Sequence, residues 1–414
     1  MELLSFLKPF ADALFKLATI RRWNDHPRPF DITELDKQGH KAIVAFLFAK
    51  IEEVERGKRV DWRGLIEGLV FEALERALLT DLKPRVFHKV VKSRRQKVNE
   101  YLLDHYGEAL KRVSPALREN FERYFSDEGF RSFEKHLVGA AHFVPTYWEF
   151  QFIYPVAREL WGIERTREEI ENTLEDFHHL IGIQRFLLKR KLYGFVNLCG
   201  KLRFQKRWIA LERIPQTSVM GHLFTVFTVV YLLLSKLEAS GFPVSERTFY
   251  ATAFAALFHD LPEIVTRDII SPLKEVLGKE EIRRLEVEGL EEELLPLLPP
   301  YLARELRVFL GLRPPVESEF TDRIVTADLT LKGFSSLEEL LPSKEAYPIF
   351  GSLVKLADHL SAHWEVLYTL SYGLKNDELL RAKEKLEKQV AESPVLKLFE
   401  EKGREKENLR RSSP

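Results

Sequence analysis

The sequence predicts an all-α protein built from two tandem helical domains, and two observations support this. First, three stretches with the apolar spacing of buried helices each carry a residue that can bind a metal: His222, His259 and Asp358. Second, the order of elements around these stretches is repeated in the N-terminal half, which predicts two copies of one domain. We expect domains at residues 1–150 and 196–400, a helical linker at 151–195 and a disordered tail at 401–414.

Length, composition and charge limit the classes of protein to which this chain could belong and the partners that it could bind. A chain of 414 residues suggests two or three domains, and 45% hydrophobic with 30% charged residues is typical of a globular protein. A formal net charge of zero gives no reason to expect nucleic acid or a membrane as a partner. We expect neither a membrane-spanning segment nor a signal peptide. The single Cys199 excludes an intrachain disulfide and favours a cytoplasmic location.

The N-terminal domain is interpreted as a copy of the C-terminal domain in which the candidate metal ligands are no longer all present. Four segments match in the same order: 14–23 with 198–208, 39–44 with 221–226, 70–75 with 258–263, and 141–149 with 357–365. In this alignment the candidate ligand positions of the first copy carry His40, Phe71, Glu72 and His142. Because phenylalanine cannot bind a metal, the simpler interpretation is a domain kept for packing. The alternative is a three-ligand site of His40, Glu72 and His142, since two histidines and a carboxylate can bind iron or zinc.

The linker at 151–195 contains a turn at Gly162 followed by a charged helix. It also contains His178 and His179, which as neighbours face different directions on a helix. We therefore expect a surface or core role for this pair rather than a metal site.

The second copy is organised around residues 254–272. An apolar helical run ends in His259 and Asp260, and Glu263 follows one turn later. An imidazole beside a carboxylate can hold a divalent metal. A carboxylate one turn away can take a proton from metal-bound water or give one to a leaving oxygen. This stretch therefore predicts a metal centre with its own acid–base group.

Two further residues extend the ligand set. His222 lies just inside a long apolar helix that Thr217 or Ser218 could cap. Asp358 lies on another mostly apolar helix, where a carboxylate is costly unless something pairs it. The predicted site thus has two histidines and two aspartates on three helices: His222, His259, Asp260 and Asp358. Such a set can leave metal positions open for water and substrate.

Arg207 and Trp208 precede the first of these ligands. A guanidinium matches the oxygens of a phosphate, and an indole offers a flat wall to a sugar or base. From these two residues alone, an ordinary surface arginine beside a core tryptophan is the simpler interpretation.

Taken in order, these elements resemble the HD superfamily of metal-dependent phosphohydrolases, and most closely its bacterial 5′-deoxynucleotidase branch. The branch combines an Arg-Trp pair with His-Asp-x-x-Glu, Thr-x-Asp and Pro-x-Lys. Here these motifs read Arg207-Trp208, His259-Asp260-Leu261-Pro262-Glu263, Thr266-Arg267-Asp268 and Pro272-Leu273-Lys274. The resemblance covers residues 190–400 approximately and suggests a tandem HD protein with a degenerate first copy.

The resemblance implies a phosphomonoesterase that releases phosphate from (deoxy)nucleoside 5′-monophosphates with Mn²⁺, Co²⁺ or a similar ion. It implies that Glu263 handles the proton, that Arg207 steadies the phosphate, and that Trp208 and Asp268 place the sugar. Asp268 would bind the 3′-hydroxyl. Because the family often assembles as dimers, we expect the two copies to pack as a pseudo-dimer within one chain, with a further homodimer left open.

Residues 275–345 form an insertion relative to the first copy, because 98 positions separate Asp260 from Asp358 and only 70 separate Glu72 from His142. We expect acidic amphipathic helices joined by proline turns, which could cap the cleft and tune substrate choice. Two acids in this region, Asp322 and Asp328, are expected to be helix caps or surface groups rather than ligands.

Two other functions stay open. The same centre could cleave nucleoside triphosphates or guanosine tetraphosphate, which a dense Lys/Arg cluster beside the ligands would favour. The sequence shows no such cluster. A different class is a non-catalytic nucleotide sensor or scaffold, against which the intact second ligand set argues.

Overall fold

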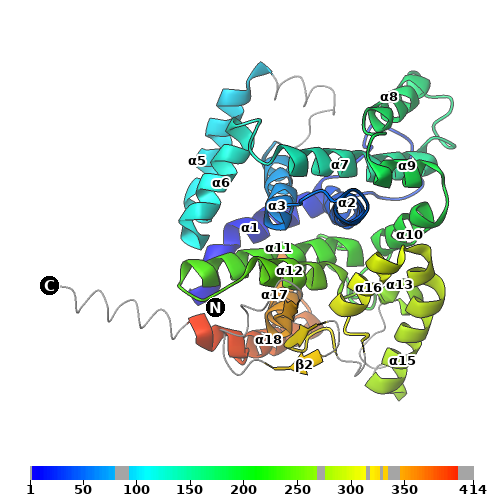
Figure 1. Ribbon diagram of the computed structural model, residues 1–414. Helices are drawn as coiled ribbons and strands as arrows, with labels where there is room; N and C mark the ends of the chain where they lie inside the picture. Colours follow the sequence, from blue (N-terminus) through cyan, green and yellow to red (C-terminus); the bar gives the residue numbers. More distant parts are fainter. Residues whose placement is uncertain are drawn as a thin grey trace.

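The computed structural model describes residues 2–79, 93–267, 276–313, 318–326, 330–333 and 346–399. Helices dominate these residues, and the one sheet among them has three short strands, so the predicted all-α class is confirmed. The N-terminal helices, blue to teal in Figure 1, lie above the green-to-red helices of the C-terminal half.

The first half begins with a 3₁₀ turn (Glu2–Leu7). It continues with α1 (Lys8–Thr19), α2 (Glu34–Arg56), α3 (Trp62–Leu78), α5 (Arg95–Val113), α6 (Pro115–Ser126) and α7 (Ser132–Ile153). Residues 151–195, the predicted linker, contain α8 (Ile163–Asp176) and α9 (Ile181–Leu187). Helix α8 packs on α7, and α9 packs on α2. The domain boundaries themselves stay a prediction, and the tail at 401–414 lies outside the described residues.

The second half begins with α10 (Lys191–Gly200) and a 3₁₀ turn (Lys201–Arg203). Its helices are α11 (Val219–Ala239), α12 (Glu246–Phe258), α13 (Glu263–Thr266), α15 (Lys279–Gly289), α16 (Pro300–Phe309), α17 (Gly351–Ser371) and α18 (Asp377–Ala391). Helix α11 packs against α12 and α17, and these three helices carry or precede the predicted ligands.

Helices α2 and α11 lie against each other and join the two halves (Figure 1). Their contact is close because each presents a glycine to the other. A Cβ added to Gly39 would lie 2.5 Å from the carbonyl oxygen of Met220, and one added to Gly221 would lie 3.1 Å from a carboxylate oxygen of Asp36. The expected pseudo-dimer arrangement stays a prediction, although this shared contact supports it.

Helix α11 is long and apolar enough to cross a membrane by length and composition, which the sequence analysis did not anticipate. However, 94% of its most apolar window is buried inside the protein. Its apolar surface is covered by α2, α12 and α17, as is usual for a core helix of a soluble-type helical protein.

The insertion contains the predicted helices α15 and α16, and a sheet that was not predicted is formed by two strands within it and a third just after it. Strands β1 (Arg323–Val325), β2 (Thr330–Lys332) and β3 (Tyr347–Ile349) pair antiparallel in the order β2-β1-β3. Strands of three residues are too short to show an alternating pattern, so periodicity cannot reveal them. Asp322 accepts hydrogen bonds from the backbone N–H and the hydroxyl of Ser352 in the first turn of α17, which agrees with one of its two predicted roles, that of a helix cap. Asp328 lies outside the described residues.

Candidate metal centre

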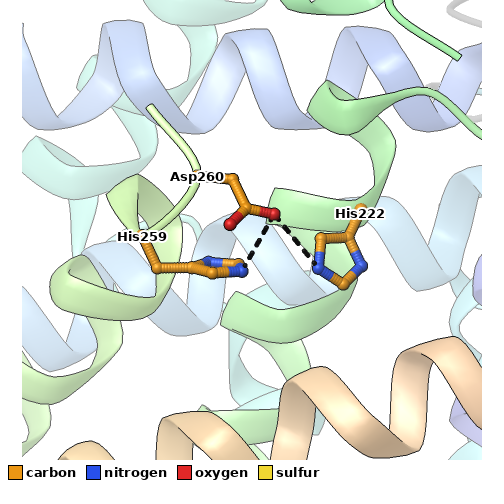
Figure 2. A group of neighbouring side chains, drawn as sticks. All are labelled: His222, His259 and Asp260. Carbon is orange, nitrogen blue, oxygen red and sulfur yellow. Dashed lines mark ion pairs between the residues drawn. The ribbon is translucent and has the colours of Figure 1, made fainter. Parts of the chain in front are cut away.

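Three predicted ligands meet at the ends of two helices. His222 lies in the first turn of α11, His259 immediately follows α12, and Asp260 lies in the turn that comes next. Figure 2 shows the three side chains pointing toward one another. Oδ2 of Asp260 lies 3.6 Å from Nε2 of His222 and 3.3 Å from Nε2 of His259. One ligand atom from each residue lies within 4.8 Å of the others, which suits a shared metal ion.

The fourth predicted ligand, Asp358, lies beside this group. Its Oδ1 is 3.2 Å from Nε2 of His222, and its Oδ2 accepts a hydrogen bond from Lys355 at 2.7 Å. Asp358 is not part of the compact group of three, but its Oδ1 faces that group while Lys355 holds its Oδ2. The structure therefore brings three predicted ligands together and places the fourth in contact with one of them.

The outer nitrogen of each imidazole is occupied, which turns the inner nitrogen toward the group. Nδ1 of His259 lies 2.7 Å from the carbonyl oxygen of Ala256, so this nitrogen must carry the proton. Nδ1 of His222 lies 3.0 Å from the hydroxyl of Ser361. Both Nε2 atoms are buried, and neither has a hydrogen-bond partner among the described residues. Buried polar atoms without partners are costly, so this donor set fits a metal ion.

The charges around the group suit a cation. Burial opposes ionisation of Asp260, but His259, His222 and Arg207 outweigh it and lower the pKa of this carboxyl. Burial also opposes ionisation of Asp358, but Lys355 and the two histidines lower its pKa well below the usual value. Both carboxylates are therefore ionised at neutral pH and available as ligands.

Arg207 and Trp208 lie next to this group. Backbone pairing between Lys206 and Ser218 brings the Arg-Trp segment to the start of α11. Nη1 of Arg207 lies 3.4 Å from Oδ2 of Asp260, and 12% of the arginine side chain is exposed. The indole N–H of Trp208 donates to Glu365 at 2.8 Å. The structure thus places a guanidinium at the edge of the candidate metal site.

The two remaining predicted residues have different outcomes. Glu263 begins α13, and its backbone N–H donates to the carbonyl oxygen of Asp260 at 3.1 Å, which fixes it one turn after the ligand as predicted. Burial alone would lower the pKa of Arg207, but nearby carboxylates outweigh it and raise this pKa. Glu365, Asp260 and Asp358 contribute most, and Glu263 contributes as well. Asp268 lies outside the described residues.

Sequence reasoning missed three residues that hold this site together. These are Lys355, which binds Asp358; Ser361, which binds His222; and Glu365, which binds Arg207 and Trp208. All three are on α17, the helix of Asp358. A signal for Glu365 was present, because an acid follows a tryptophan at the matching position in both halves, Trp148-Glu149 and Trp364-Glu365.

In the first half, the structure corrects the position assigned to His40. Thr33 caps α2 and Ser218 caps α11, so counting from the caps matches His222 with Lys37. The Nζ atom of Lys37 lies 2.7 Å from Nε2 of His142. His40 instead points away, with its Nε2 2.9 Å from the carbonyl oxygen of Val196.

The caps of the next helix correct a second match. Asp61 caps α3 and Ser245 caps α12, so Glu75 and Arg76 match His259 and Asp260, in place of Phe71 and Glu72. Arg76 lies 3.6 Å from Glu34, a partner of Arg22. Glu72 is bound by Lys41 at 2.6 Å and by Tyr124 at 2.9 Å.

The suggested metal site of His40, Glu72 and His142 is therefore not assembled. His40 faces the Val196 carbonyl, Glu72 is occupied by a lysine, and His142 contacts Lys37. In the part of the chain that the structure describes, the only cluster with metal-ligand geometry is that of His222, His259 and Asp260.

Comparison with known proteins agrees with this geometry. Residues 199–387 match the family model of the HD domain. The C-terminal half of the chain therefore resembles an HD domain. The chain is 26% identical over 206 residues to the 5′-deoxynucleotidases of Yersinia pestis (strain Pestoides F) and Yersinia pseudotuberculosis serotype O:3 (strain YPIII), which is 48% of this chain and 85% of each relative. The HD domain and these relatives support a metal-dependent phosphohydrolase.

Proposed function

We propose that the protein is a phosphomonoesterase that releases phosphate from nucleoside or deoxynucleoside 5′-monophosphates. One observation carries the proposal: two buried imidazole nitrogens without hydrogen-bond partners face a carboxylate, and a partly exposed guanidinium lies beside them. The first arrangement suits a metal ion and the second suits a phosphate. The similarity to 5′-deoxynucleotidases supports the choice of nucleotide substrates.

The residues divide between metal and substrate. His222, His259, Asp260 and Asp358 would hold a divalent ion such as Mn²⁺ or Co²⁺. When bound, such an ion polarises a phosphoryl oxygen and lowers the pKa of a bound water. Arg207 would hold two oxygens of the phosphate and stabilise the charge that develops there. Glu263, one turn from Asp260, would accept or deliver the proton.

The sugar would be placed by Trp208 and, by resemblance, Asp268. Because the indole N–H already donates to Glu365, Trp208 can offer only its ring to a ligand. An aromatic surface favours a sugar or base face without selecting one base. We therefore expect broad acceptance of bases.

We further propose that the protein acts in the cytoplasm on small nucleotides. Its one cysteine, Cys199, is buried and free, as suits a reducing compartment. The zero net charge gives no attraction to nucleic acid.

The test is phosphate release from a panel of nucleotides by metal-free protein resupplied with Mn²⁺, Co²⁺, Mg²⁺ or Zn²⁺. We expect release from monophosphates, with loss of that release in Asp260→Ala. Cleavage restricted to nucleoside triphosphates or guanosine tetraphosphate would replace the proposed substrate by a larger one. Absence of release from every nucleotide, with the protein folded and metal bound, would contradict an enzyme and favour a nucleotide sensor.

A further inference from the structure

Glu365 is the buried carboxylate to which the Arg207-Trp208 segment is attached. Only 2% of this residue is exposed. Its oxygens lie 2.8 Å from the indole nitrogen of Trp208, 3.5 Å from Nε of Arg207 and 3.0 Å from Nη1 of Arg213. The hydroxyl of Thr217 donates to it as well. One carboxylate thus contacts Arg207 and Trp208 and also Arg213 and Thr217, which lie later in the same loop.

The backbone of this segment is also held from the same point. Arg213, bound to Glu365, donates to the carbonyl oxygen of Arg207 at 2.9 Å. Trp208 has a positive φ of 57°, a conformation that a non-glycine residue keeps only when its surroundings enforce it. The hydrogen bond from the indole to Glu365 is one such restraint, and the close approach of Arg213 to the ring is another.

Glu365 also links this segment to the metal ligands. Asp358, Ser361 and Glu365 follow each other at three- and four-residue intervals, so they lie on one face of α17. Asp358 contacts His222, Ser361 binds the outer nitrogen of His222, and Glu365 binds Arg207. A single rigid helix face therefore sets the distance between the candidate metal position and the guanidinium.

We propose that Glu365 is a positioning residue that holds Arg207 at the distance from the metal ligands where a bound phosphate can meet both. This inference rests on the proposed function, because it takes Arg207 as the phosphate-binding group. In addition, the guanidinium binds phosphate only while Glu365 holds Nε and the backbone of Arg207 in place. Nη1 is then directed at Asp260 and at the position proposed for the phosphate. Without that carboxylate the side chain would gain rotamers, and phosphate binding would have to order it again.

The first half supplies a matched control. Glu149 on α7 accepts from Nε of Arg22 at 2.9 Å and from the indole of Trp23 at 2.7 Å, and Trp23 has a φ of 55°. The same local interactions therefore occur without the metal-ligand group. Substituting Glu149 removes a comparable buried carboxylate from Arg22 and from Arg203, so it reports the cost to folding while the contacts of Arg207 and of the metal-ligand group stay in place.

The experiment compares Glu365→Gln, Arg207→Met, the double variant and Glu149→Gln, with Mn²⁺-loaded full-length protein. Steady-state kinetics with deoxynucleoside 5′-monophosphates should show kcat/KM lowered roughly 10- to 100-fold in Glu365→Gln, the usual effect of an outer partner. Metal content should be unchanged. In the double variant, the Glu365 substitution should add almost nothing to the loss from Arg207→Met, because its effect passes through Arg207. Glu149→Gln should keep wild-type kcat/KM.

Two outcomes would overturn the proposal: independent, multiplying losses in the double variant, or equal losses of kcat/KM in Glu365→Gln and Glu149→Gln. If Glu365→Gln does not fold, Glu365→Asp replaces it, since aspartate keeps the charge but shortens the reach to Arg207. Binding of inorganic phosphate to the Mn²⁺-loaded variants gives a second readout. If the wild-type protein cleaves no monophosphate, the proposed function fails, while phosphate affinity that depends jointly on Glu365 and Arg207 still supports the positioning role.

Discussion

The two halves of the protein share one framework of hydrogen bonds and ion pairs and differ at its centre. In each half an arginine and a tryptophan with positive φ bind a buried glutamate: Arg22, Trp23 and Glu149 in the first, and Arg207, Trp208 and Glu365 in the second. In each, a backbone bridge joins this segment to the cap of the following helix, Arg21 with Thr33 and Lys206 with Ser218. These parallels support the duplication hypothesis.

The difference lies at the positions of the ligands. Where the second half has His222 and Asp260, the first has Lys37 and Arg76, and where α17 carries Ser361, α7 carries Pro145. Lys37 contacts His142, and Arg76 contacts Glu34. The first half thus places basic side chains where the second half would need a metal ion, and Pro145 has no hydroxyl to match the one with which Ser361 orients His222. The comparison teaches that the framework is separable from the chemistry, since it persists where the ligands are lost.

The largest effect is expected from Asp260→Ala set against Arg76→Ala. Asp260 contacts both histidines and Arg207, so its loss should lower kcat/KM by more than the roughly 100-fold typical of outer partners. Arg76 occupies the matching position but contacts Glu34, so its loss should leave kcat/KM unchanged. Steady-state phosphate release measures both. A comparable loss in Arg76→Ala would mean that the first half takes part in turnover.

The next largest difference between the two halves is expected in metal binding. We expect one divalent ion per chain, because the first half offers Lys37 and Arg76 at two ligand positions. His222→Lys, which copies the first half into the second, should abolish binding, whereas Lys37→Met should leave it intact. Elemental analysis after dialysis against Mn²⁺ measures this. Two ions per chain, or loss of the ion in Lys37→Met, would contradict the assignment.

A pH-dependent effect on stability is expected from Glu75, which matches His259. Burial, and then neighbouring Glu72, raise the pKa of Glu75 from 4.5 to about 7. The folded protein therefore keeps a proton that the unfolded chain releases between these values, so the free energy of unfolding falls as the pH rises through that window. Glu75→Gln should be more stable than wild type by about 3 kcal/mol at pH 8 and by little at pH 4.5. Urea unfolding across this range measures the difference. A difference independent of pH would show that ionisation of Glu75 is not its source.

The smallest effect is expected at the contact between the halves. A Cβ at Gly39 would meet the backbone carbonyl of Met220, which cannot move aside cheaply, so Gly39→Ala should cost about 1–3 kcal/mol of stability. At Gly221 the nearest atoms belong to the side chains of Leu35 and Asp36, which can shift. The gain in helix propensity of about 1 kcal/mol should then offset the crowding in Gly221→Ala. Thermal unfolding compares the two, and equal losses would show that crowding at the two glycines costs the same despite their different neighbours.

Sequence patterns predicted the second site better than the first. His259 and Asp260 directly follow an apolar helix, and the specific signal was the ordered set of motifs around them, from Arg207-Trp208 to Glu263. The error over His40 arose because Lys37 and His40 are only three residues apart on α2 and both are buried, so periodicity cannot choose between them. Only the caps at Thr33 and Ser218 fix the register, and Lys37 then falls opposite His142.

The sequence by itself determined the helical class, the residues able to bind a metal and the helices that carry them, because these follow from local periodicity and side-chain chemistry. Tertiary structure alone decided which of many acids serves the Arg-Trp segment. Glu365 is 157 positions from Trp208, and their 2.8 Å contact exists only because α17 packs along α11. It also decided that Asp358 contacts His222 while Lys355 holds its other oxygen. Such contacts depend on the packing of helices far apart in the chain, which local pattern does not encode.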